Sequence, residues 1–455
     1  MAASHSGGRG RSLAWPARAQ LPRLAWRALL AALTAVAAGV AGASNDDFGG
    51  ELRLRREQLR GNAQGPLAVG DALSPGVAPP TPGATLAEAE LRGVWRAPAL
   101  DLVRASIFGN ALLAAERSDN SAAGSVRTTQ ARLNEGFAAG EFGAWQASVG
   151  KKVVAWDVGY GFRPNDVVQQ ERRRRLLTTT QEGRPLVEVE RFHADASATL
   201  VWVNPQNAND TDDASRQGLE SALATRTYVR AGSADWHAFA RWGEHTRASL
   251  GAAVAWVATD ELEWHASARI MQRHDAWQFD SSAGNAPVAA NPWLQTTLGG
   301  AAQALLGASW TGQQQISLLV ECWYDGTAPA DSDWEAWLSR NRALAAFGTQ
   351  PGLPSALVSA AGGNLAWQAT PFATNNLRRN NVFARLAWQE QRWVLSLDAL
   401  VTPSDRGRVV TAAVQWQGER LRVNAAWRTY GGPADALFSQ LPQSQVGLLA
   451  VTLPF

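Results

Sequence analysis

Apolar and polar residues alternate along most of the chain, in segments of about ten residues. In the segment 261–272, the apolar positions are Leu262, Trp264, Ala266, Ala268 and Ile270, and the polar positions are Glu263, His265, Ser267 and Arg269. Successive side chains of a β-strand point to opposite faces of its sheet. The alternation therefore predicts strands with one apolar face and one polar face.

This pattern predicts eighteen strands. Their ranges are 51–60, 85–96, 100–117, 125–138, 142–156, 186–194, 196–204, 221–231, 235–243, 246–258, 261–273, 301–311, 314–325, 379–389, 391–402, 408–417, 420–430 and 443–455. Long connections follow odd-numbered strands, at 61–84, 157–185, 205–220, 274–300 and 326–378, and short connections follow even-numbered ones. We therefore expect an all-β fold, a transmembrane antiparallel β-barrel of about 18 strands (range 14–18) with long external loops and short periplasmic turns.

Two further features distinguish a membrane barrel from a soluble β-sandwich, whose strands also alternate. Tryptophans recur at strand ends beside tight turns, where a bilayer interface favours them; they are Trp310, Trp388, Trp393 and Trp416. The chain ends on the apolar residues Leu449, Val451, Leu453 and Phe455. This ending resembles the closing strand of bacterial outer-membrane barrel proteins. The resemblance implies recognition by the barrel-insertion machinery and a place in the outer membrane of a Gram-negative bacterium, beside lipid bilayer and lipopolysaccharide.

The first 43 residues differ from the rest of the chain. They contain five arginines and no acidic residue, and 28–40 is an uninterrupted run of Ala, Leu, Val, Thr and Gly. A basic segment, a short apolar run and the small residues at 41–43 predict a secretory signal peptide over 1–43, followed by the barrel over 44–455. The alternative is an N-terminal membrane anchor, although the 13-residue run is shorter than the roughly 20 residues that span a bilayer.

Composition and charge exclude other classes of protein. The chain has 455 residues and is 46% hydrophobic and 18% charged, which is too apolar for a disordered protein. After residue 43 no apolar run approaches the roughly 18 residues of a membrane helix, so a helical membrane protein is excluded. Without the five arginines of 1–43, 37 of the 42 basic residues remain against 40 acidic ones, a net charge of −3. Charge therefore indicates no nucleic-acid partner.

The segment 150–166 ends a predicted strand and enters a long loop that contains Arg163, followed by the run Arg172, Arg173, Arg174 and Arg175. The segment resembles the strand-to-loop segment of porin-like and alginate-export-like barrels, in which a basic residue, a Trp and a Pro-Asn-Asp turn precede an inward loop. The resemblance implies no particular substrate. Two interpretations are open. The arginines form a basic constriction that selects solutes by charge, or they lie in an external loop and pair with lipopolysaccharide phosphates.

The polar faces of the predicted strands carry more basic than acidic residues. The basic ones are Arg92, Arg226, Arg230, Arg241, Arg247, Arg269, Arg385, Arg422 and Arg428, and the acidic ones are Glu88, Glu90, Glu263, Glu321 and Asp398. Arginine binds carboxylate and phosphate through its planar donors, so the excess predicts a modest preference for anions. Arg226, Arg230, Arg241 and Arg269 join Arg163 and 172–175 as candidate constriction residues. The alternative is that these arginines form salt bridges within the barrel wall.

Features that indicate catalysis are few. The six histidines have no metal-ligand spacing, there is no G-x-S-x-G motif, and Cys322 has no second cysteine to pair with. His265 with Glu263 or Ser267 imitates part of a catalytic set, but residues two apart on a strand share a face without touching. We therefore expect no enzyme activity, cofactor or metal.

A barrel of this width leaves an aqueous channel. The sequence therefore predicts a porin-like channel for the passive passage of small hydrophilic solutes, with anions favoured. Two alternatives remain: a barrel plugged by the loops 157–185 and 326–378 that exports a polymer or anchors a surface assembly, and an outer-membrane hydrolase. Within the loop 326–378, an Asp start and helical spacing predict a short helix over 333–342, and residues 74–84 are expected to be irregular.

Overall fold

The computed structural model describes residues 48–97, 103–120, 124–169, 181–204, 220–284, 286–288 and 290–455. The predicted signal peptide at 1–43 and the arginine run at 172–175 lie outside the described residues. In the described part, eighteen strands form one antiparallel sheet, and β12 (His274–Phe279) and β13 (Trp293–Leu298) form a separate hairpin.

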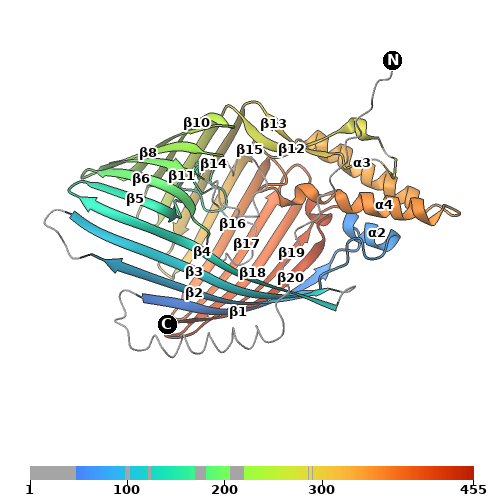
Figure 1. Cartoon of the computed structure of the whole chain (residues 1–455), viewed down its shortest axis with the longest axis horizontal. Helices are drawn as coiled ribbons and strands as arrows, with labels where there is room; N and C mark the ends of the chain where they lie inside the picture. Colours follow the sequence, from blue (N-terminus) through green and yellow to red (C-terminus); the bar gives the residue numbers. More distant parts are fainter. Residues whose placement is uncertain are drawn as a thin grey trace, which may run out of the picture.

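The strands of the main sheet form a closed barrel (Figure 1). They are β1 (Phe48–Gly61), β2 (Gly83–Arg96), β3 (Val103–Asn120), β4 (Gly124–Phe142), β5 (Trp145–Lys152), β6 (Arg184–Phe192), β7 (Ala196–Val203), β8 (Ala222–Ala231), β9 (Ala234–Gly243), β10 (Arg247–Val257), β11 (Leu262–Met271), β14 (Ala301–Thr311), β15 (Ile316–Asp325), β16 (Asn380–Glu390), β17 (Trp393–Thr402), β18 (Gly407–Gln417), β19 (Arg422–Gly431) and β20 (Gln443–Pro454). Each strand pairs with its neighbours in chain order, and β1 pairs with both β2 and β20. The predicted 18-stranded barrel is confirmed, and every predicted range overlaps the strand found there.

The alternation places apolar side chains outside the barrel and polar side chains inside it. On β11, Ile270 is 62% exposed on the outer face, whereas Ser267 and Arg269 are buried on the inner face. On the neighbouring strands, the outer-face residues Leu250 and Leu306 are also more than half exposed. An outer wall of exposed aliphatic side chains around a polar interior is the arrangement of a transmembrane barrel.

Exposed tryptophans lie at the end of the barrel where the connections are short. Trp310 precedes the turn 312–315, and Trp388 and Trp393 lie on either side of the turn 391–392. Their amphipathic rings are suited to the boundary between lipid and water. We call this end of the barrel the turn end, and the opposite end, where the long connections lie, the loop end.

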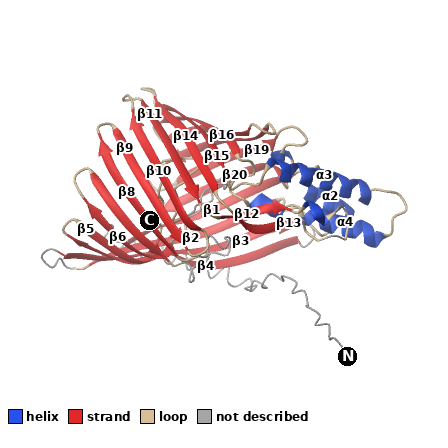
Figure 2. Cartoon of the chain, turned by 90° about the horizontal axis from the view of Figure 1, so that it is seen from above, coloured by secondary structure: helices blue, strands red, loops and turns tan. Residues whose placement is uncertain are grey.

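Helices and the β12–β13 hairpin gather at the loop end (Figure 2). α2 (Pro66–Leu73) connects β1 to β2, and α3 (Asp331–Gly348) and α4 (Ser355–Trp367) lie between β15 and β16. We call these three helices and the hairpin the cap. α3 confirms the predicted helix over 333–342 and extends it at both ends, and 74–82 is irregular as predicted. The sequence pattern does not predict α2, α4 or the hairpin.

The cap packs on the barrel through a cluster of tryptophans. Trp334 and Trp337 of α3 are fully buried, and the ring centroids of Trp334 and Trp293 are 5.0 Å apart. The cluster continues to Val409 on β18 and to the partly buried Leu400 on β17. Burial of several large rings favours one fixed position of the cap on the barrel.

Among the described residues, no helix has both the length and the apolar character needed to cross a membrane.

Candidate pore and inward loop

The chain after β5 turns into the barrel and lies against its inner wall. The Asp157 carboxylate accepts a hydrogen bond from Ser267 Oγ on β11 (2.8 Å). Asn165 Nδ2 donates to the same hydroxyl (2.9 Å) and to the backbone oxygen of Ala268 (3.1 Å). Because Ser267 belongs to the polar inner face, these contacts place 153–169 in the lumen. We call this segment the inward loop.

Glu321 on β15 holds the middle of the inward loop. Its carboxylate accepts hydrogen bonds from the backbone N–H groups of Tyr160 and Gly161, both at 2.6 Å, and lies 2.9 Å from His265 Nε2. Glu321 is fully buried. Through these three contacts Glu321 fixes the loop at a second point on the inner wall.

The inward loop also has an apolar side that packs on the wall. Val154, Trp156, Val167 and Val168 are buried in one cluster with residues of β6 to β10, namely Leu186, Val201, Val203, Ala224, Phe239 and Ala253. Apolar residues on the inner face of a wide barrel would otherwise be exposed to water. The loop covers them and therefore forms a stable lining that narrows the lumen.

Glycines on the inner wall provide the space for these contacts. A Cβ atom at Gly251 would lie 1.8 Å from Asn165 Oδ1, and one at Gly307 would lie 2.2 Å from His265 Nε2. Contacts this short are impossible for real atoms. Gly251 therefore allows Asn165 to approach the wall, and Gly307 allows the ring of His265 on β11 to lie across β14 toward Glu321 on β15.

Asp157 combines an uncommon backbone conformation with a perturbed carboxyl group. Its φ angle is 96°, a region that residues with a Cβ atom seldom adopt. Burial raises the pKa of the Asp157 carboxyl above its ordinary value, against the opposing effects of the Asn165 N–H, the Ser267 hydroxyl and the Arg163 charge. Local strain and perturbed pKa values concentrate at functional positions, and here both lie where the inward loop meets β11.

Three of the candidate constriction arginines form ion pairs in the wall. The nitrogen–oxygen distances are 3.4 Å for Arg226–Glu190, 3.0 Å for Arg230–Asp235 and 2.7 Å for Arg241–Glu220. Burial raises the pKa of Glu220, but Arg241 and Thr246 oppose it and hold that pKa below its ordinary value. These carboxylates compensate the arginine charges, as expected if the arginines form salt bridges within the barrel wall.

Arg269 and Arg163 stabilise the inward loop. The buried Arg269 donates to the backbone oxygen of Pro164 (3.3 Å) and to Ser249 Oγ (3.0 Å). Arg163 lies within the loop, and its Nε donates to the backbone oxygen of Gly159 (2.9 Å). The structure thus brings these two residues together at the inward loop, where the guanidinium of Arg226 also lies 5.8 Å from the ring centroid of Trp156. Arg230 lies beside the β8–β9 turn instead. The arginines at 172–175 lie outside the described residues.

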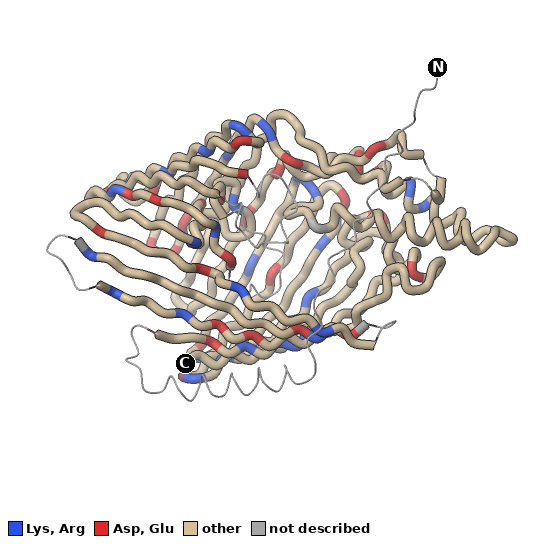
Figure 3. The backbone as a smooth tube through the Cα atoms, viewed as in Figure 1, with Lys and Arg blue, Asp and Glu red and all other residues tan. Residues whose placement is uncertain are grey.

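The excess of basic over acidic residues on the inner face is smaller than the sequence pattern predicts. Strand pairing adds the inner-face acids Glu51, Glu57, Glu116, Glu135, Glu141, Glu188, Glu190, Asp235 and Asp325. It adds the basic residues Arg53, Arg55, Arg96, Arg104, Arg132, Lys152 and Arg184. Many pair directly, as in Arg53–Glu88 (3.3 Å) and Arg385–Asp398 (3.5 Å), and both signs are interspersed along the strands (Figure 3). These pairs depend on strand register, which the count of residue types did not use.

The last strand forms the seam that closes the barrel. β20 pairs with β1 from Glu51↔Pro454 to Gly61↔Gln443, and the backbone groups of Phe455 and Gly50 exchange two hydrogen bonds of 2.9 Å. The remaining members of the predicted closing strand are Leu449, Val451 and Leu453. Leu449 and Leu453 are about half exposed on the outer face. The final strand therefore contributes apolar side chains to the outer face of the barrel.

His265 and His245 lack the contacts that the hydrolase alternative requires of a catalytic histidine. His265 and Ser267 do not hydrogen-bond each other, and Cys322 is exposed. His245 Nε2 contacts Asp275 (2.7 Å) and Thr297 Oγ1 (3.2 Å) with the same ring nitrogen, whereas a nucleophile–histidine–acid relay uses both nitrogens. Within the described ranges, no three His, Cys, Asp or Glu side chains gather closely enough to hold a metal ion.

Among solved structures, the chain is similar to several variants of a bacterial porin. A mutant of the Rhodopseudomonas blastica porin is 10% identical, with a TM-score of 0.41 over 90% of this chain and 99% of that chain. A triple mutant of the same porin gives the same values, and a further mutant is 11% identical at a TM-score of 0.41. No protein-family model matches the chain, and no curated protein matches it. The strand topology of the chain itself is that of a closed 18-stranded antiparallel β-barrel.

Proposed function

We propose that the protein is an outer-membrane channel through which small hydrophilic solutes diffuse passively, with a modest preference for anions. The observation that carries the proposal is a closed 18-stranded barrel with a polar inner wall and a loop fixed inside it. Barrels of about 16–18 strands leave an aqueous channel, whereas those of about eight are filled by their own side chains. The inward loop would then set the width of the passage.

The proposed location is the outer membrane of a Gram-negative bacterium. The exposed aliphatic outer wall and the tryptophans of the turn end support insertion into a bilayer. We propose that the turn end faces the periplasm and the loop end faces outward, where lipopolysaccharide surrounds the barrel. The apolar ending of β20 supports delivery by the barrel-insertion machinery.

The anion preference is proposed to come from inner-face arginines without an acidic partner. Arg92 lies on the lumen side of β2, opposite the lumen-facing Asn110. Arg422 lies opposite the inner-face Thr452 of β20. Within the part of the chain that the structure describes, neither arginine forms an ion pair. Both lie toward the turn end, so the preference would arise at that mouth of the channel.

Single-channel recording in planar bilayers tests the proposal. We expect discrete conductance steps and, in a salt gradient, a reversal potential on the anion side. Replacing both Arg92 and Arg422 by Gln should move the reversal potential toward zero. The matched control is Arg191→Gln, because Arg191 lies on the outer face, over the ring of Trp145 at 5.3 Å. Cation selectivity would contradict the anion preference.

A second function, a plugged barrel for polymer export or surface assembly, is favoured by one contact. Trp323 on the inner wall stacks with Phe162 of the inward loop at 5.8 Å and donates from Nε1 to Asn376 Oδ1, in the segment after the cap helices (3.2 Å). The inward loop and the segment that follows the cap helices therefore meet inside the barrel. Folded protein that gives no conductance steps would reject the open channel and favour this alternative.

A further inference from the structure

A row of polar residues crosses the outer face of β1, β2, β3 and β4 near the loop end. Its members, each directly opposite the next in the strand register, are Arg56, Thr85, Arg117 and Arg127. Directly opposite residues of antiparallel strands point to the same face of the sheet. Leu54, two residues before Arg56, is 55% exposed on the outer face, so the whole row lies there. We call these four residues the arginine row.

The arginine row lies where the apolar outer wall ends. On β2, Trp95 at the turn end is exposed on the same face as Thr85, ten residues away. A strand that rises about 3.3 Å per residue with a tilt of about 45° covers about 23 Å of height over this length. The apolar band of a membrane barrel is about 25 Å tall. The outer-face residues of β2 between these two positions are uncharged, namely Ala87, Ala89, Leu91 and Gly93. The row therefore lies at the level where lipid headgroups begin.

The arginine row carries more positive charge than its surroundings compensate. Asp119, the next outer-face residue beyond Arg117, accepts a hydrogen bond from Arg56 Nη2 (2.8 Å) and lies 3.9 Å from Arg117 Nε. Arg127 forms no ion pair with any residue that the structure describes. Three arginines and one aspartate leave a net charge of +2. Because exposed ion pairs are weak, Asp119 leaves the guanidinium groups available to an anion.

Arg117 and Arg127 form the most strongly basic part of the row. They lie directly opposite each other, and both side chains are exposed. Like charges in directly opposite positions destabilise a pair of strands. An anion between the two guanidinium groups replaces this repulsion with charge-assisted hydrogen bonds, and the planar donors of arginine match the oxygens of a phosphate.

We propose that the arginine row binds an outer-leaflet lipid that carries two phosphate groups, the lipid A part of lipopolysaccharide. One phosphate lies between Arg117 and Arg127, and the other faces Arg56, whose Nη1 donates to Thr85 Oγ1 (2.9 Å). The acyl chains lie on the apolar wall below the row. This inference rests on the proposed outward orientation of the loop end.

The length and charge of the row favour a lipid with two phosphates. The row spans three strand spacings, about 14 Å, which is wider than one phosphate group. Its net charge of +2 compensates one negative charge on each of two phosphates. Gly83 of β2 keeps the Arg56 end of the row open, because a Cβ atom there would lie 2.9 Å from Arg56 Nη2.

Native mass spectrometry of the folded protein in detergent micelles tests the proposal with three lipids. They are lipid A with two phosphates, the same lipid A without phosphates, and phosphatidylglycerol, which has one. We expect lipid A to bind at least about tenfold more tightly than either of the others. Equal binding of the two forms of lipid A would overturn the proposal, because the apolar wall alone would then hold the lipid. Equal binding of phosphatidylglycerol would overturn the assignment to a lipid with two phosphates.

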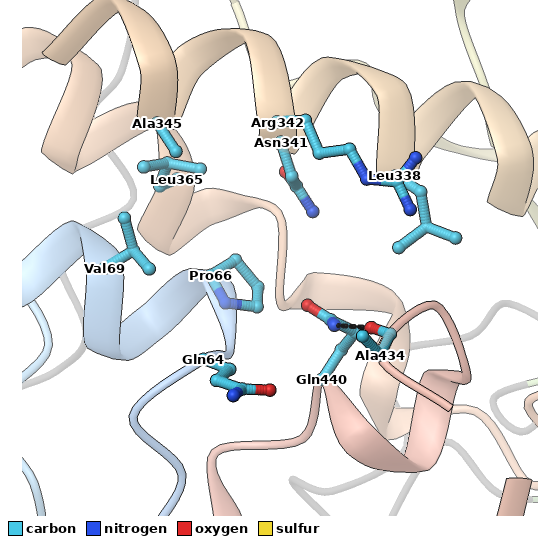
Figure 4. A pocket seen from close by; sticks show the side chains of 10 residues that line it. All are labelled: Gln64, Pro66, Val69, Leu338, Asn341, Arg342, Ala345, Leu365, Ala434 and Gln440. Atoms are coloured by element: carbon cyan, nitrogen blue, oxygen red, sulfur yellow. Dashed lines mark hydrogen bonds between the residues drawn. The ribbon is translucent and has the colours of Figure 1, made fainter. Parts of the chain in front are cut away.

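A double variant and a matched control locate the binding. Arg117→Gln combined with Arg127→Gln should weaken lipid A binding at least about tenfold. Arg191→Gln combined with Arg342→Gln removes the same charge elsewhere and should leave binding unchanged. Arg191 lies on the outer face at the turn end, and Arg342 lies on α3 beside the pocket between the cap helices and the β19–β20 connection (Figure 4). Unchanged binding in the first double variant, or equal loss in both, would overturn the proposal.

Conductance separates this inference from the proposed function. Arg117 and Arg127 face away from the lumen, so their double variant should conduct like the parent protein. Phosphate-dependent lipid binding by a protein that gives no conductance steps would reject the channel alone. Conductance steps without phosphate-dependent lipid binding would reject the lipid site alone.

Discussion

At the scale of residues, the position of the inward loop depends on a few polar side chains that meet small wall residues. Asn165 and Asp157 share the hydroxyl of Ser267, and Glu321 holds two backbone N–H groups of the loop. Each contact needs space on the wall, and at Gly251 that space is the volume of a missing side chain. The loop is therefore sensitive to single added methyl groups.

We predict that Gly251→Ala displaces Asn165 from the wall, because the new methyl group would occupy the place of its amide oxygen. Overpacking of this kind costs about 1–3 kcal/mol. The displaced loop should be cleaved by chymotrypsin after Phe162 at least several-fold faster than in the parent protein. The control is Gly109→Ala, where a Cβ atom would meet nothing within 4 Å. Equal cleavage rates in all three proteins would show that Asn165 does not hold the loop.

At the scale of residues, the sequence predicts which arginines face the lumen but not the acidic residues with which they pair. The inner-face positions of Arg226, Arg230, Arg241 and Arg269 follow from alternation, but their partners do not. Glu190 lies two strands away from Arg226, and Glu220 precedes β8 in a connection. Such pairs require the register of neighbouring strands, which a period of two residues leaves open.

At the scale of elements, the cap is a separate layer on the barrel, and aromatic rings form much of the core between them. Trp334 Nε1 donates to the backbone oxygen of Leu377 (2.7 Å), and Trp337 Nε1 donates to that of Gln368 (2.9 Å). Arg378 joins Asp331 at the start of α3 to Asp405 between β17 and β18, at 2.9 and 3.0 Å. These contacts connect the cap to the barrel at several points.

We predict that Trp334→Ala loosens the cap and leaves the barrel folded. Loss of a fully buried indole costs about 3–5 kcal/mol, and all of that loss falls on the cap cluster. Hydrogen exchange of α3 should become markedly faster while that of β5 to β11 stays unchanged. Trp367→Ala is the matched control, because Trp367 on α4 is 52% exposed. Faster exchange throughout the barrel would show that cap and barrel unfold as one unit.

The strands were predictable and most of the cap was not, for a physical reason. A strand in the wall of a membrane barrel faces lipid on one side and water on the other. Apolar and polar residues therefore alternate along its whole length. α4 contains Gly362 and Gly363, which weaken any helical pattern, and it is stabilised instead by close packing on Gly70 of α2. Contacts between distant segments of this kind leave little trace in the local sequence.

At the scale of the whole molecule, the two sides of the wall have opposite preferences for charge. We predict that Leu397→Arg, on the outer face of β17, destabilises the inserted barrel by about 2–4 kcal/mol if Leu397 lies near the middle of the bilayer. Ser396→Arg, one residue earlier and on the inner face, should fold normally and reduce the conductance. Folding yield in lipid vesicles, read from electrophoretic mobility before heating, checks both variants.

The reverse result, with Ser396→Arg failing to insert and Leu397→Arg tolerated, would contradict the sidedness of the wall. Equal tolerance of both variants would place Leu397 away from the bilayer centre, where a charge costs little.

The seam between β1 and β20 has a consequence for how the protein is made. A ribosome completes β1 long before β20, and until the last strand pairs with the first, the sheet has two open edges. Open edges recruit strands from other chains, and contacts between distant parts of a chain form slowly. Before the seam closes, the unfinished sheet therefore has to be kept apart from its copies. Damage to the seam will be seen first as aggregated or degraded protein, and only afterwards as altered conductance of the proposed channel.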